Sequence, residues 1–293
     1  MEPSPAESSL TPKAANACAA AERSHEVRSD GLAGVLATPP PGTWALHRRE
    51  PSSNLHSLVA WLWAVEWDLS NHNDHVQSTL PHPSAHLVIE NGSAMVHGPT
   101  TRRFTRTLSG IGRVIAIRFH PAGLQPFLNS PVSELVDAVV PAEAVLRLDG
   151  QPNVRNLIKR IGSQEDLDVA MGLLESLLDE PKLPIDPSVD EVNRIVESIA
   201  SDRSITNLAS LRRVIEIHPR RVQRLFARYV GMTPKAVIRR YRLQEAASAA
   251  LSGQITDWAA VAADLGYYDQ AHLVRDFTDA IGTPPAEYAK RSQ

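Results

Sequence analysis

A repeated pattern near the C-terminus most constrains how this chain can fold. RVQRLFARYVGMTP, which ends at Pro234, shares its skeleton with LVRDFTDAIGTPP, which ends at Pro285, 51 positions later. The identical pairs are Arg224 and Arg275, Phe226 and Phe277, Gly231 and Gly282, and Pro234 and Pro285, and the apolar pairs are Val222 and Leu273, and Val230 and Ile281. This spacing predicts a duplicated structural unit.

Each copy has the order of a helix-turn-helix, in which a short apolar helix precedes a turn and a second helix. In the second copy Gly266 lies at the turn, where a positive φ is easiest for glycine. The Thr233-Pro234 pair supplies an N-cap and a first-turn proline. We expect helices over 189–200, 207–215, 219–229, 234–251, 258–264 and 269–280, and a short one after Pro284.

Charge is distributed unevenly over the two copies. Residues 203–242 hold ten Arg and one Lys against one acid, a net charge of +10, whereas residues 243–293 carry −4. The whole chain has a formal charge of only −3. A basic block this dense indicates a polyanionic partner, with double-stranded DNA as the first expectation. An acidic protein partner is the alternative, and salt-dependent binding to duplex DNA separates the two.

The helix from Pro219 is amphipathic. At 100° per residue, Val222, Leu225, Phe226 and Tyr229 share one face, and Arg220, Gln223, Arg224 and Ala227 share the other. Guanidinium groups can bind guanine O6 and N7, and a Gln amide can bind adenine N6 and N7, in the major groove. The sequence therefore predicts base reading by Arg220, Gln223 and Arg224.

The corresponding face of the second helix is less basic. It carries Gln270, Ala271, Val274 and Arg275, and Asp276 and Asp279 lie nearby. We expect Gln270 and Arg275 to read bases, and the first unit to dominate the affinity. The predicted phosphate contacts flank these faces; they are Arg212, Arg213, Arg221, Arg228, Arg239, Arg240 and His272, with Arg242 placed among them.

The rest of the chain divides by composition. Residues 1–42 are rich in Ala, Pro and Ser, which is typical of a disordered tail. Residues 43–180 begin with short alternating apolar runs that indicate a small antiparallel barrel or sheet, and end with helical periodicity. Three prolines in residues 180–187 mark a linker, assigned to 181–187. The expected fold is α+β, with an all-α domain of two helix-turn-helix units at 188–293.

Cysteine and histidine limit the alternatives. Cys18 is the only cysteine, which excludes a disulfide framework and a thiolate zinc site and favours a cytoplasmic protein. The N-terminus lacks the basic start and apolar core of a secretory signal, and no run reaches the length of a membrane span. Seven histidines cluster between residues 56 and 120, namely His56, His72, His75, His82, His86, His97 and His120.

A cupin-like metal enzyme domain is the alternative that these histidines raise. Their spacing matches no diagnostic metal motif, and no nucleophile or carboxylate pair is assembled, so we expect no metal, no cofactor and no catalytic site. Trp61, Trp63 and Trp67 could line a ligand cavity, although alternation along a strand favours a place in the core. The ligand-binding residues stay unassigned.

Residues HPRRVQRLFARYVGMTPKAVIRRYRLQEA and AAVAADLGYYDQAHLVRDFTDAIGTPPAEY resemble the AraC/XylS family of bacterial transcription regulators. The resemblance covers about 189–288 and implies two helix-turn-helix units joined by a long central helix, here 234–251. It places base contacts on Arg220, Gln223 and Arg224, and on Gln270, Ala271, Val274 and Arg275. The first unit departs from the pattern, because Leu211-Arg212, Glu216 and His218 replace Leu-Ala, a turn Gly and a capping Ser.

The N-terminal half resembles the effector domains of one AraC subgroup, through LPHPSAHLVIENGSAMVHGP and RVIAIRFHPAGLQPFLNSPVSELVD. The resemblance implies a regulator in which an effector bound by the first domain, or dimerisation through it, biases promoter binding or recruitment of RNA polymerase. His218 is a weak replacement for a capping Ser, so a phosphate contact is its alternative role. The partners expected are promoter DNA, a small-molecule effector, RNA polymerase and a second copy of the chain.

Overall fold

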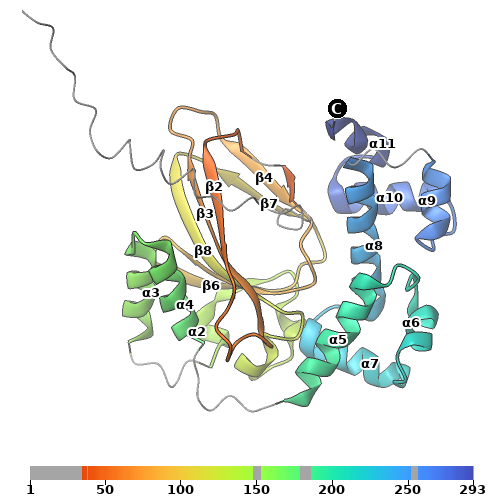
Figure 1. Cartoon of the computed structure of the whole chain (residues 1–293), viewed down its shortest axis with the longest axis horizontal. Coiled ribbons are helices and arrows are strands. Elements are labelled where there is room, and N and C mark those ends of the chain that lie inside the picture. The colour runs from red at the N-terminus through yellow and green to blue at the C-terminus, as the bar shows by residue number, and fades with distance from the viewer. Residues whose placement is uncertain (1–34, 38, 148–152, 179–185, 252–256, 293) are drawn as a thin grey trace, which may run out of the picture. The chain divides into compact units, whose positions relative to one another are not determined.

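Strands form the first part of the fold in a computed structural model that describes residues 35–37, 39–147, 153–178, 186–251 and 257–292 (Figure 1). Most of the expected tail and linker lies outside these ranges. Val35–Ala37 forms strand β1, so the expectation of a tail up to residue 42 is wrong at its end. Of the linker, Pro187 begins helix α5 after Asp186, whose side chain caps it.

The strands pair antiparallel in two sheets. One sheet has the order β1-β4-β7 and the other has the order β2-β3-β8-β5-β6-β9, and within the described residues neither closes into a barrel. The fold is therefore the sheet form of the expected N-terminal domain. The remaining strands are β2 (Trp44–Arg49), β3 (Val59–Asp68), β4 (His75–Thr79), β5 (His86–Glu90), β6 (Ser93–His97), β7 (Phe104–Leu108), β8 (Ile111–Phe119) and β9 (Val139–Pro141).

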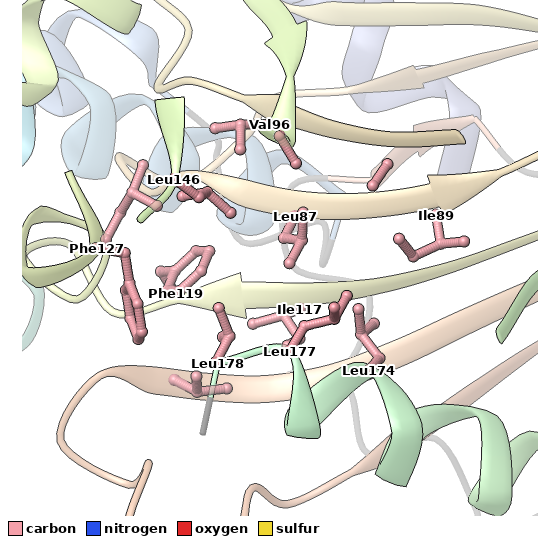
Figure 2. Close-up of a cluster of buried hydrophobic side chains, with 14 of the residues drawn as sticks. Leu87, Ile89, Val96, Ile117, Phe119, Phe127, Leu146, Leu174, Leu177 and Leu178 are labelled. Atoms are coloured by element: carbon pink, nitrogen blue, oxygen red, sulfur yellow. The ribbon is translucent and has the colours of Figure 1, made fainter. Parts of the chain in front are cut away.

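Helices α3 (Val154–Ser163) and α4 (Leu167–Ser176) cover one face of the six-stranded sheet (Figure 1). Alternate strand residues such as Leu87 and Ile117 pack there against Leu174 and its neighbours (Figure 2). The period of two along each strand places the other residues on the opposite face. Short elements complete this part: η2 (Gln125–Phe127), η3 (Val132–Leu135) and α2 (Ala142–Val145).

The opposite face of the large sheet has its own apolar cluster, which includes Trp67, Val88, Leu108, Val114 and Ala116. Trp67 is 7% exposed, and its indole N–H donates to the carbonyl of Ser109 at 3.2 Å. A Cβ at Gly112 would lie 2.1 Å from the Trp67 ring, so glycine is required where the ring crosses β8. The expectation of a core position therefore holds for Trp67.

The C-terminal part is helical, and α8 (Pro234–Leu251) joins its two units. Val237 and Ile238 of α8 belong to the core of the first unit, whereas Leu243 and Ala246 belong to the core of the second. The expected central helix and pair of helix-turn-helix units are confirmed. The other helices are α5 (Pro187–Ser201), α6 (Leu208–Val214), α7 (Pro219–Leu225), η4 (Phe226–Val230), α9 (Trp258–Asp264), α10 (Gln270–Ile281), α11 (Pro285–Tyr288) and η5 (Ala289–Ser292).

Candidate DNA-binding interface

Side-chain caps start both helices of the first unit. Asn207 and Ser210 form a capping box at α6, in which the Asn207 side chain accepts from the N–H of Ser210 and the Ser210 hydroxyl accepts from the N–H of Asn207. At α7, His218 Nδ1 accepts from the N–H of Arg220 at 3.3 Å. Ile215 occupies the turn with an ordinary φ of −114°. The unusual His218 is therefore a cap, and its local role does not need a phosphate.

The α7 helix presents the polar face that its periodicity predicts. Val222 is 1% exposed and Phe226 is 0% exposed, so the apolar face is packed into the first unit. Arg220, Gln223 and Arg224 are exposed on the other face. Three donor-bearing side chains therefore project from one helix, and their groups match purine edges.

The structure differs from the expected helix after Leu225. Residues Phe226–Val230 form a π-helical turn, and the N–H of Gly231 donates to the carbonyl of Phe226 at 2.8 Å. A wheel of 100° per residue does not apply to this turn, because each π-helical turn contains more residues. The three predicted base readers precede it and keep their positions, whereas Arg228 lies within it.

The second unit has the same frame. Leu273 and Phe277 are 0% exposed, as are Phe226 and Val230 in the first unit. Gly231 has a φ of +80° and Gly282 has a φ of +84°, so the two aligned glycines end their helices in the same left-handed conformation. The duplication inferred from the sequence is thus visible in both the core and the chain reversal.

The polar face of α10 is exposed but more neutral. Gln270, Ala271, His272 and Arg275 are exposed, and Val274 is partly buried. The Oδ2 atom of Asp276 forms an ion pair with Nε of Arg239 on α8 at 2.6 Å. The same oxygen lies 3.9 Å from Nε2 of His272. The acid that flanks the second recognition helix is therefore engaged by a neighbouring cation.

The predicted phosphate contacts have different surroundings. Arg212, Arg213 and Arg228 are exposed. Arg221 is exposed and pairs with Glu191 at 2.7 Å, and Arg239 is exposed and pairs with Asp276. These five arginines and His272 all reach the surface of the helical part.

The prediction is wrong for Arg240. Its side chain is 5% exposed and donates to the carbonyls of Pro81 at 3.2 Å and Thr100 at 3.0 Å. Burial lowers the pKa of Arg240 to about 10. Both terminal nitrogens of this buried guanidinium donate to backbone carbonyls, so Arg240 joins α8 to the sheet residues and does not face a phosphate.

The same correction applies to Arg242, which is 1% exposed. Its guanidinium donates to the carbonyl of Ile199 and pairs with Glu245. Its position one turn from exposed Arg239 explains the error, because a continuous run of arginines conceals which face of α8 is packed.

Tyr268 is a surface residue that the sequence reasoning did not single out. It is 94% exposed and directly precedes Asp269, whose side chain accepts from the N–H of His272 and caps α10. Its phenol hydroxyl stands at the surface next to the start of α10, where it can donate a hydrogen bond. Its place immediately before a capping Asp was the available signal.

The histidines of the sheet do not form a metal centre in the part of the chain that the structure describes. No group of three or more His, Cys, Asp or Glu side chains is close enough there to hold an ion. In the same ranges no helix is both long and apolar enough to cross a membrane. The metal-enzyme alternative thus gains no support from the described side chains.

Comparison with known proteins finds matches to two separate segments of the chain. Residues 47–141 match the model of a domain of unknown function, DUF6597, and residues 211–291 match that of a helix-turn-helix domain. A search of curated proteins found no match.

Among solved structures, ToxT from Vibrio cholerae is similar. One ToxT structure is 10% identical, covers 85% of this chain and 98% of its own, and has a TM-score of 0.35. Another, bound to (E)-4-(8-methylnaphthalen-1-yl)but-3-enoic acid, is 12% identical, with 86% and 100% covered and a TM-score of 0.37. These TM-scores are too low for the likeness to carry a functional argument. The helix-turn-helix match and the duplicated units instead identify a DNA-binding domain of the AraC type, and with it a DNA-binding transcriptional regulator.

Proposed function

We propose that the chain reads promoter DNA mainly through α7, with Arg220, Gln223 and Arg224 at base edges. The observation that carries this proposal is the exposure of all three side chains on the face opposite buried Val222. Direct readout in the major groove needs a helix whose outward side chains carry paired donors. The α7 helix supplies them, and its apolar face fixes their direction.

The second unit adds a smaller contribution to DNA affinity through Gln270 and Arg275. Exposed Ala271 and partly buried Val274 can touch thymine methyl groups. The phenol of Tyr268 lies beside the start of α10 and can donate to a phosphate. We assign the remaining positioning contacts to the exposed cations of the predicted set: Arg212, Arg213, Arg221, Arg228, Arg239 and His272.

The sheet domain is the proposed sensor. We infer that a small-molecule effector or dimerisation acts through this domain on promoter binding or on recruitment of RNA polymerase. The contacts of Arg240 support this division, because they join α8 to the loops at Pro81 and Thr100. A change in the sheet can thereby reach the helix that both DNA-binding units share. A chain that works on chromosomal DNA belongs in the cytoplasm.

Substitutions of two arginines in the full-length protein test the proposed roles in DNA binding. The operator used is one found by binding-site sequencing on genomic DNA. Arg224→Ala should weaken operator binding by about 1 to 3 kcal/mol, a factor of roughly 5 to 150, and relax preference at one base pair. Arg228→Ala is the matched variant from the next turn. It should weaken operator and random duplex equally and reduce the salt slope by about 1.

Both results are read from titrations of the two duplexes at several salt concentrations. Unchanged operator selectivity in Arg224→Ala contradicts its reading role. If the protein binds duplex DNA without any dependence on salt, or does not bind duplex DNA at all, an acidic protein is favoured over DNA as the partner.

A further inference from the structure

The recognition helix of the second unit carries an acid next to its base-reading arginine. Asp276 directly follows Arg275 on α10, and its side chain is 16% exposed. DNA phosphates repel a carboxylate, so an acid on a helix that contacts DNA is expected to weaken binding unless a local partner changes its effect. The structure supplies such a partner from α8, the helix that joins the two units.

Arg239 is this partner, and the ion pair engages the inner nitrogen of its guanidinium. Nε of Arg239 lies 2.6 Å from Oδ2 of Asp276. The two terminal nitrogens of an arginine lie beyond Nε, at the end of the side chain. The side chain of Arg239 is 46% exposed, against 16% for Asp276. The carboxylate is therefore the covered member of the pair, and the guanidinium is the member that reaches solvent.

Two further side chains lie around the carboxylate. Nε2 of His272, one turn earlier on α10, is 3.9 Å from the same oxygen of Asp276. The rings of His272 and Tyr267 meet edge to face, with their centroids 5.1 Å apart. Burial, and then the charge of Asp276, raise the pKa of Tyr267, so its phenol lies near the carboxylate. Asp276 thus meets side chains from α8, from the turn before α10 and from α10 itself.

We propose that Asp276 is a positioning residue for DNA binding, which holds Arg239 so that the outer end of its guanidinium meets a backbone phosphate beside the bases that α10 reads. The inference rests on the proposed function and deepens it, because it gives an acid a favourable role in binding a polyanion. Asp276 does not touch DNA in this role and acts through Arg239.

Two opposed effects of the Asp276 charge decide the sign of its contribution. An unrestrained arginine loses rotamer freedom when it binds a phosphate, which reduces affinity by a factor of up to about 30. An ion pair formed before binding removes much of that loss. The carboxylate also repels the phosphate, by a factor of about 3 at roughly 7 Å in water, and salt screens part of this repulsion. Preorganisation is the larger effect, so Asp276 strengthens binding.

Removal of the Asp276 charge tests this sign in the full-length protein. Asp276→Asn should weaken binding of the operator and of a random duplex alike, by a factor of about 3 to 10, because a phosphate contact carries little sequence information. Unchanged or stronger binding by Asp276→Asn overturns the proposal.

Asp279→Asn is the matched control on the same helix. Asp279 is exposed, and among the residues that the structure describes it forms no ion pair. Its substitution removes only a repulsion, so affinity should stay equal or rise by up to about threefold. The two neighbouring acids should therefore respond with different signs, and a loss of affinity in Asp279→Asn as large as in Asp276→Asn overturns the proposal.

The effect of Asp276 should disappear without Arg239. In a protein that carries Arg239→Gln, Asp276→Asn should no longer weaken binding, and continued weakening overturns the proposal. Urea unfolding of each variant verifies that it is folded. Arg239→Lys keeps the charge but lacks the fork, so it should also weaken binding by a factor of about 3 to 10. Equal affinity of Arg239→Lys and the wild type overturns the proposal even if Asp276→Asn does not fold.

A measurement without DNA separates this inference from the proposed function. In NMR spectra of the free protein, the Nε–H of Arg239, identified by its loss in Arg239→Gln, should exchange slowly with water in the wild type and faster in Asp276→Asn. Equal exchange in both overturns the positioning role while selective, salt-dependent operator binding leaves the proposed function intact. A wild type that binds no duplex DNA refutes the proposed function, and the inference falls with it.

Discussion

At the scale of single residues, the burial of His82 and His86 makes the stability of the folded protein depend on pH. Burial is the first cause that lowers the pKa of each to about 3, and Arg118 is the next. The unfolded chain binds a proton at each histidine below a pKa of about 6.5. Between pH 6.5 and 3 the unfolded state therefore holds more protons than the folded state, and the stability contributed by the neutral rings is lost as pH falls.

We predict that His86→Gln flattens the pH dependence of unfolding. The wild type should lose about 2 kcal/mol through this residue between pH 7 and pH 5. Gln keeps an acceptor for the indole N–H of Trp63, which donates to His86, and removes the titration. His72 is exposed, and His72→Gln is the matched surface substitution. The measurement is urea unfolding from pH 5 to 7, and equal slopes for His86→Gln and wild type contradict the argument.

The arginines show what residue type alone leaves open. Arg224, Arg240 and Arg242 belong to one basic block, yet only Arg224 is exposed. The helical period correctly placed Arg224 opposite buried Val222. It could not place Arg240, because the carbonyls that hold it belong to Pro81 and Thr100, which are distant in sequence. Predictions within one amphipathic helix were therefore stronger than those that depended on a second element.

At the scale of elements, the turn between α9 and α10 depends on Gly266. Its φ is +76°, and an added Cβ would lie 2.7 Å from the Cβ of Thr206. Both the left-handed backbone and the close approach select against a side chain. The Asp269 cap then starts α10 within a few residues.

We predict that Gly266→Ala lowers the free energy of unfolding by about 1 to 3 kcal/mol. Gly162 of α3 is the matched control, because its nearest atom to an added Cβ is 3.6 Å away and it has no left-handed φ. Gly162→Ala should be neutral or stabilising by up to about 1 kcal/mol. Urea unfolding monitored by circular dichroism compares them, and an equal effect of both substitutions rules out the backbone explanation.

At the scale of the whole molecule, the two DNA-binding units share a frame but not a charge. The first presents Arg220, Gln223 and Arg224 together, and the second presents Arg275 near Asp279. The carboxylate of Asp276 forms an ion pair with Arg239 of α8. The positive field of the chain is therefore concentrated on one of two similar helices.

This asymmetry predicts unequal losses of affinity. Arg224→Ala should cost more operator affinity than Arg275→Ala, although the two residues are equivalent in the repeat. A fluorescence anisotropy titration of both variants with the same operator provides the comparison. Equal losses would show that the two helices contribute alike despite their different charges.

The sequence by itself determined the duplicated units, the bounds of α8 and α9, the outward face of α7 and the turn glycine Gly266. Each of these follows from local periodicity, capping or backbone conformation. Only the tertiary structure decided that the strands form two open sheets, that Arg240 is buried, and that Arg239 pairs with Asp276. Register and long-range burial join residues that no local pattern connects, because they are set by which strands and helices pack together.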